Sequence, residues 1–142
     1  MTQEDKELLL KDLCARLPYG VKFACNKNVY TAKGLDLIVT DEGDWEYAVT
    51  SKGIAPIEID FIKPYLFPLS SMTEEQKMEI KSLCDGTEIF DDGSWMSYIS
   101  ILGNFNFEIN LAVVNWLNAN NFDYRGLIPK GLAIDATGLN IY

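Results

Sequence analysis

The sequence contains no histidine, and this absence removes several kinds of catalytic site. A serine or cysteine hydrolase triad, a histidine-ligated zinc site and an H-E-x-x-H metalloprotease helix all need an imidazole. The loops G-x-x-x-x-G-K-[ST] and G-x-G-x-x-G, which bind nucleotide phosphates, are also missing. The common enzyme signatures are therefore missing, and we predict neither a cofactor nor a metal site.

Basic residues are scarce as well, with 12 lysines and arginines against 21 acidic residues and a net charge of −9. Non-specific binding to nucleic acid needs clustered cations that displace counterions from the phosphates. Here the lysines are scattered, and only two arginines are present. We predict no nucleic-acid partner.

Long apolar runs are lacking too, since none approaches the roughly 20 residues that span a bilayer. The first residues, MTQEDKELLL, are acidic and amphipathic, unlike a secretory leader. An odd set of three cysteines without a C-x-x-C pair, namely Cys14, Cys25 and Cys84, favours reduced thiols in the core over a disulfide framework. These features predict a cytoplasmic protein with no membrane partner.

The first half of the chain combines one helix with short β-like runs. Residues 3–16 place leucines on one helical face, and Pro18 stops the helix. Turn-forming residues then separate five strand-like segments, which are VKFAC, NVYTA, LDLIV, WEYAV and IEIDFI. Pro64 and Pro68 end this region. Five short strands joined by tight turns predict a small barrel or curled sheet.

The second half begins with a helix whose start carries two overlapping capping boxes, Ser71 to Glu74 and Thr73 to Gln76. The helix should reach Cys84. A β region follows, with one strand over 95–102 and another over 104–110, where polar and apolar residues alternate. Residues 111–120 form a third helix with Asn110 as its N-cap, and a turn-rich tail ends the chain.

The sequence thus predicts an α+β protein. Residues 1–68 form the N-terminal helix and a small antiparallel β-barrel or curled sheet. Residues 69–142 form a helix, a β-hairpin, a helix and the tail, and the two halves share one core. The strand over 104–110 could pair with a second copy of the chain if it lies at a sheet edge.

Acidic and aromatic residues are concentrated between Lys81 and Arg125, where no other basic residue occurs. Such a segment suits a basic partner protein, with Trp95 and Tyr98 as candidate anchors. The alternative is that the aromatics form the core while the acids face solvent. The pair Asp91 and Asp92 is typical of a turn, although paired carboxylates also occur in glycosidases.

Arg125 stands in the motif Asp123-Tyr124-Arg125-Gly126. Asp123, Tyr124 and Arg125 are candidate binding residues. The guanidinium could pair with a carboxylate, most simply Asp123 or Glu108, or with an anionic ligand. Asp123 could equally cap a short turn. We favour a structural clasp that ends the last helix and docks the tail.

Three blocks of the sequence carry a family resemblance: KELLLKDLCARLPYGV, IKPYLFPLSSMTEEQK and NWLNANNFDYRGLIPKGLAIDATGLNIY. They resemble a family of small uncharacterised proteins of gut bacteria and their phages and prophages. The resemblance covers roughly half of the chain, implies a phage or mobile-element origin and assigns no activity. Asn120 and Asn121 stand where that family often has histidines.

These observations lead to a hypothesis of a non-catalytic protein-interaction or accessory protein of phage or mobile-element origin. One alternative is a small-molecule-binding or carboxylate-based hydrolytic domain that uses Arg125 and acidic residues in a cleft. A weaker alternative is an acidic DNA mimic that inhibits a DNA-binding protein.

Overall fold

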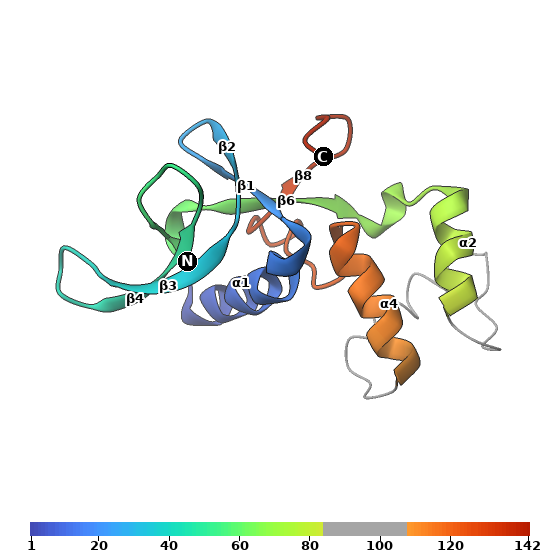
Figure 1. Ribbon diagram of the computed structural model, residues 1–142, viewed down its shortest axis with the longest axis horizontal. Helices are drawn as coiled ribbons and strands as arrows, with labels where there is room; N and C mark the ends of the chain where they lie inside the picture. The colour runs from blue at the N-terminus through green and yellow to red at the C-terminus, as the bar shows by residue number, and fades with distance from the viewer. Residues whose placement is uncertain (84–107) are drawn as a thin grey trace.

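The computed structural model describes residues 1–83 and 108–142, with the side chains of 108–110 excepted. Its α+β architecture confirms the expected fold class, with a curled sheet in place of a closed barrel among the described residues. Helix α1 (Gln3–Arg16) lies along one side of the strands, and α2 (Glu74–Leu83) and α4 (Glu108–Ala119) stand together at one end of the molecule (Figure 1). The hairpin of β3 (Gly34–Val39) and β4 (Trp45–Thr50) forms the opposite end (Figure 1).

The strands that the structure describes form two sheets. One sheet has the order β2-β1-β6-β7 and combines β1 (Lys22–Cys25), β2 (Asn28–Thr31), β6 (Lys63–Pro68) and β7 (Phe122–Asp123), while β8 (Ile134–Asp135) also pairs with β6. The other sheet has the order β3-β4-β5, from β3 (Gly34–Val39), β4 (Trp45–Thr50) and β5 (Ile57–Glu58). All pairings are antiparallel except those of β7 and β8 with β6, which are parallel.

Local sequence signals explain several of these elements. Thr2 caps α1 by accepting a hydrogen bond from the amide of Asp5. Asn26 and Lys27 both have positive φ, at 48° and 68°, and form the two-residue turn between β1 and β2. The N-terminal helix and this turn were predicted from the sequence and are confirmed.

At α2, only one of the two predicted capping boxes is present. Thr73 and Gln76 exchange side-chain to backbone hydrogen bonds at 2.9 and 3.2 Å. Ser71 instead donates its hydroxyl to the carbonyl of Pro68, within the short 3-10 helix η3 (Leu69–Ser71). The prediction from Ser71 to Glu74 is therefore wrong, because Ser71 belongs to the preceding turn.

Strand β6 was missed in the sequence. A proline lacks the amide that a central strand needs, so Pro64 was expected to end the β region. Pro64 is tolerated because it pairs only with Phe23 of β1, while β8 joins β6 from Tyr65 onward. The predicted strand IEIDFI is wrong beyond Glu58, where the 3-10 helix η2 (Ile59–Phe61) begins.

The start of α4 corrects a second prediction. The strand expected over 104–110 is wrong for its last three residues, which form the first turn of α4, so Asn110 lies inside the helix. Ile109, Val113 and Leu117 are spaced by four residues, as on one face of a helix. This helical period includes residues 108–110, where polar and apolar residues also alternate as in a strand. Residues 104–107, the strand over 95–102 and Cys84 lie outside the described residues.

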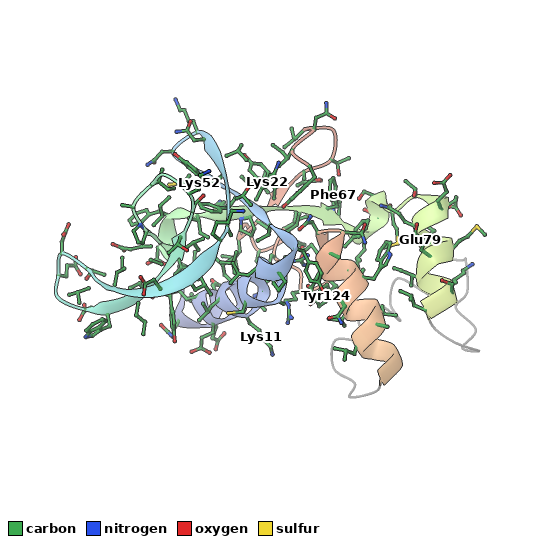
Figure 2. All side chains as sticks on the ribbon, in the orientation of Figure 1. Lys11, Lys22, Lys52, Phe67, Glu79 and Tyr124 are labelled. Atoms are coloured by element: carbon green, nitrogen blue, oxygen red, sulfur yellow. The ribbon has the colours of Figure 1, made fainter. Side chains whose placement is uncertain are left out.

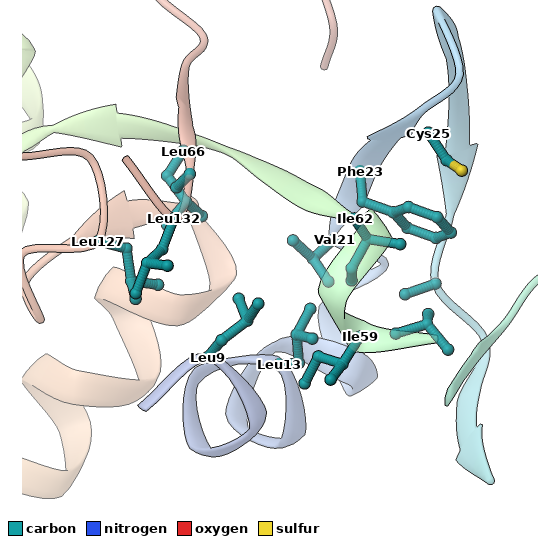
Figure 3. Packing of buried hydrophobic residues seen from close by; sticks show 13 residues of the cluster. Leu9, Leu13, Val21, Phe23, Cys25, Ile59, Ile62, Leu66, Leu127 and Leu132 are labelled. Carbon is teal, nitrogen blue, oxygen red and sulfur yellow. The ribbon is translucent and has the colours of Figure 1, made fainter. Parts of the chain in front are cut away.

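Among the described residues, the buried side chains form two clusters. In the first, Leu9 and Leu13 of α1 point towards Ile59 and Ile62 and towards Leu66 of β6 (Figure 3). This cluster also takes Leu127 and Leu132 from the tail (Figure 3). Cys25 belongs to it, but Cys14 is exposed, so the prediction that Cys14 is a core residue is wrong.

The second cluster lies between α2 and α4. Ile80 of α2 packs with Val113 and Leu117 of α4 and with Phe122 of β7. Trp116 stacks on Phe122 with the ring centroids 5.7 Å apart, and its indole donates to Glu79 of α2 at 2.9 Å. Tyr124 also belongs to this cluster, so the residues after α4 connect it to the rest of the fold.

A leucine pair tests the first cluster. We expect Leu13→Ala to lower the free energy of unfolding by about 2–5 kcal/mol, because Leu13 is fully buried and its truncation leaves a cavity. The matched change Leu139→Ala, at a half-exposed position, should have little effect. Urea denaturation followed by circular dichroism measures both, and equal losses would contradict the packing described here.

Candidate functional site

Arg16, the last residue of α1, joins the N-terminal helix to the C-terminal part of the chain. Its guanidinium forms a bidentate ion pair with Asp12, with Nε 2.8 Å from Oδ2 and Nη2 3.1 Å from Oδ1. The same group donates to the carbonyl oxygens of Phe122 at 2.6 Å and Leu117 at 3.5 Å. Because the last carbonyls of a helix lack partners inside it, Arg16 satisfies one of them at the end of α4.

Arg125 approaches the same carboxylate from the tail. Its Nε lies 3.3 Å from Oδ1 of Asp12, and its Nη2 donates to the hydroxyl of Tyr124 at 3.0 Å. That hydroxyl in turn donates to Asn118 at 2.9 Å. Both guanidinium groups lie over the ring of Tyr124, 5.6 Å (Arg16) and 4.9 Å (Arg125) from its centroid, and Figure 2 shows Tyr124 between α1 and α4.

Asp123 closes the turn that follows. Its Oδ1 accepts from the amide of Leu127 at 2.9 Å and its Oδ2 from the amide of Ile128 at 2.8 Å. Gly126, which lies between Asp123 and Leu127 in the chain, has a φ of +76°, a conformation that glycine adopts without strain. The carboxylate is buried and uses both oxygens for this cap.

The predicted motif is therefore brought together, but with a different partner for its arginine. Arg125 pairs with Asp12 of α1, whereas Asp123, one of the two partners expected from the sequence, binds backbone amides. The contacts of Asp123 and Tyr124 are internal, as in a clasp. That these residues also bind a ligand stays a prediction, and Trp95 and Tyr98 lie outside the described residues.

Asp12 and Arg16 were not recognised in the sequence as part of this cluster. Their i, i+4 spacing, with the acid first, is a known signal for an ion pair on a helix. That spacing does not reveal burial, and both side chains are completely buried here. Contact between Asp12 and Arg125 depends on the tertiary fold, so no local signal identifies it.

The β3–β4 hairpin carries a different kind of surface. Strand register pairs Leu37 with Tyr47 and Val39 with Trp45, which places these four side chains on one face. Their exposed fractions are 51% for Leu37, 55% for Val39, 71% for Trp45 and 42% for Tyr47. We call these four residues the apolar hairpin face, and large aromatic side chains this exposed are typical of binding surfaces.

An acidic groove lies between this hairpin and η2. It has a volume of about 490 Å³ and includes six carboxylates. The lining residues are Lys6, Thr40, Asp41, Glu42, Asp44, Glu46, Glu58, Asp60 and Phe61. We call this set the acidic groove. A smaller groove of about 180 Å³ runs between α1 and the side chains of Trp45 and Tyr47, and Lys6 and Glu46 line both grooves.

Lys6 binds two of these carboxylates, with Nζ 2.6 Å from Glu46 and 2.8 Å from Asp60. Hydrogen bonds raise the pKa of Lys6 above its ordinary value, and the bond to Asp60 contributes more than the bond to Glu46. The hydrogen bond from Lys6 lowers the pKa of Glu46. Both groups therefore stay charged at neutral pH.

Two further findings concern membrane spans and metal sites. No helix of residues 1–83 or 108–142 is long and apolar enough to cross a bilayer. Within the same ranges, acidic and cysteine side chains form no cluster suited to a metal ion. Comparisons with family models, with curated proteins and with solved structures each find no match to the chain.

The clasp can be tested by removing each arginine. We expect Arg16→Ala to lower the free energy of unfolding by about 3–5 kcal/mol, since it removes the bidentate partner of buried Asp12 and leaves the longer contact of 3.3 Å with Arg125. Arg125→Ala should cost on the order of 1–2 kcal/mol because its guanidinium is partly exposed. Thermal and urea unfolding measure both losses.

The control Lys130→Ala removes an exposed lysine 3.8 Å from Asp5 and should change little. An unchanged melting temperature for Arg125→Ala would contradict the clasp.

The Lys6 ion pairs predict a dependence of stability on pH. The pKa of Glu46 is lower in the folded protein, so its contribution is present above the unfolded value near 4.5 and is lost as the pH falls through the folded value. Lys6→Met should remove that contribution, on the order of 1 kcal/mol or less for such a surface pair. Urea unfolding at pH 7 and at about pH 3 should then show a smaller difference for the variant than for the unmodified protein.

Proposed function

We propose that this protein is a non-catalytic interaction or accessory protein that binds another protein through its β3–β4 hairpin. The observation that carries the proposal is the apolar hairpin face, which presents Trp45 and Tyr47 to solvent. Tryptophan and tyrosine are enriched among the residues that contribute most to protein interfaces. Fully burying an apolar side chain such as Leu37 or Val39 of this face is worth about 1.5–3 kcal/mol.

The hairpin is packed and paired where it joins the body of the protein. Ala48 and Val49 are fully buried and pair with β5. At the tip, the amide of Thr40 donates to the carbonyl of Asp44, and the hydroxyl of Thr40 accepts from the amide of Asp44. A surface that is ordered before binding loses less conformational entropy on association, which favours a binding role for this hairpin.

The hydrolytic alternative has less support than the interaction proposal. A carboxylate that acts as a general acid near neutral pH needs a raised pKa, whereas the pKa of Glu46 is lowered by Lys6. Arg125, the other residue proposed for that role, lies against Asp12 and Tyr124. The proposed phage or mobile-element origin and the cytoplasmic location rest on the family resemblance and the composition of the sequence.

A capture experiment with matched variants tests this function. Immobilised protein is exposed to host lysate, and the captured proteins are compared between the unmodified chain, Trp45→Ser/Tyr47→Ser and the control Met78→Ser/Leu139→Ser. The control removes two exposed apolar side chains from α2 and the tail. We expect one or more proteins to be retained by the unmodified chain and the control but lost with the hairpin variant. Equal capture by all three, or no specific capture by a strictly monomeric protein, would overturn the proposal.

A further inference from the structure

The occupant of the apolar hairpin face can be inferred from the charges and hydrogen bonds around it. Residues 34–50 carry five carboxylates and no lysine or arginine. The ammonium group of Lys6, which lies beside the hairpin, is already held by Glu46 and Asp60. The hairpin therefore presents a negative potential, which Lys6 reduces at Glu46, near the start of β4.

The apolar face and the acidic groove meet along one edge of β4. Trp45 and Tyr47 line the smaller groove beside α1, and Glu46 between them lines the acidic groove as well. In the acidic groove, Phe61 is 66% exposed beside Asp60 and Glu58. An exposed aromatic ring next to carboxylates suits a lysine or arginine side chain, which the ring attracts through its π face and the carboxylates attract by charge.

Four carboxylates at the tip and wall of the groove are available to such a cation. Among the described residues, no ion pair is formed by Asp41, Glu42, Asp44 or Glu58, in contrast to Glu46 and Asp60. An extra cation in the groove would therefore meet carboxylates that have no competing partner in the part of the chain that the structure describes. Charge complementarity of this kind also accelerates the encounter of two proteins.

The hairpin edges disfavour a second copy of this chain as the occupant. On β3, the outward amide of Leu37 donates to its neighbour Asp36 at 2.8 Å. Strand β5 pairs with β4 at Ala48 and Val49, and just before these residues the outward amide of Tyr47 donates to Glu46 at 3.1 Å. Both edges thus carry a carboxylate on an amide that an added strand would need. Two copies with a net charge of −9 each also repel one another.

From these observations we infer that the hairpin binds a lysine- and arginine-bearing segment of a partner protein through side chains, with its apolar residues on Trp45 and Tyr47 and its cations in the acidic groove. This inference rests on the proposed function and adds the chemistry of the partner. It assigns affinity to the apolar face and selectivity to the carboxylates.

A defined peptide probe tests the inference on the intact protein. The probe is a labelled amphipathic peptide of lysine, arginine and leucine, and its control has glutamate in place of every basic residue. Fluorescence anisotropy gives the dissociation constants. We expect binding of the basic peptide only, with affinity falling about tenfold or more between roughly 0.02 M and 0.2 M NaCl.

Variants locate the binding. Asp41→Asn/Glu42→Gln should weaken binding of the basic peptide by about fivefold or more, and Trp45→Ser/Tyr47→Ser by about tenfold. Lys6→Met should strengthen it about twofold to fivefold, because it releases Glu46 and Asp60 for the peptide. The matched control Lys77→Met removes a lysine that pairs with Glu74 on α2, at the other end of the molecule (Figure 1), and should leave the affinity unchanged.

The outcomes separate this inference from the proposed function. Equal binding by all the variants would mean attraction to net charge alone and would overturn the inference. If lysate proteins need Trp45 and Tyr47 but are unaffected by salt and by the carboxylate variants, the hairpin is an interface for a neutral partner, and only the cationic inference fails. A dimer in size-exclusion chromatography that dissociates in Trp45→Ser/Tyr47→Ser would identify a second copy as the occupant and also overturn it.

Discussion

The buried guanidinium of Arg16 is the interaction on which the arrangement of the two ends of the chain depends. It lies at the end of α1 and holds Asp12 of the same helix together with carbonyl oxygens near the end of α4 and in β7. Removing a charged group from water costs several kcal/mol, and the attraction offsets this only when the geometry is good and the remaining donors are satisfied. A planar guanidinium meets that condition because it reaches a carboxylate and two carbonyls at once, which the single ammonium of a lysine does less well. Both arginines of the chain are used at this carboxylate, and Arg125 adds the tail to the connection.

What the sequence could predict follows from how local each signal is. Helix α1, the turn at Asn26 and Lys27, and the cap at Thr73 depend on residues within a few positions, and all three were predicted correctly. Strand β6 could not be predicted, because its pairing with segments distant in the sequence overrides the penalty that Pro64 imposes. The start of α4 was missed for a different reason, since residues 108–110 satisfy the strand and helix periods equally.

The same distinction applies to the candidate sites. The sequence indicated that residues 123–126 form a compact clasp, because an aspartate before a turn and a glycine inside it are local features. It could not indicate Asp12 as the partner of Arg125, which the packing of α1 against the tail provides. For the hairpin, the alternation of LDLIV and WEYAV places Leu37 and Tyr47 on one face. It does not show which residues of that face are buried by other elements. Val49 is buried while Trp45 is exposed, and this difference arises from the position of α1 and η2.

The carboxylates of the hairpin resolve a conflict that its exposed apolar face creates. A hairpin with exposed Trp, Tyr and Val side chains and free edges is prone to pair with other chains and to aggregate. Asp36 and Glu46 reduce this risk, because each accepts a hydrogen bond from an edge amide and places a charge where another strand would approach. Neutral or acidic surfaces gain little from such an edge, whereas a basic surface gains from every carboxylate that it meets. In the proposed function, one set of side chains thus protects the hairpin from non-specific association and leaves a cationic surface as its favoured partner.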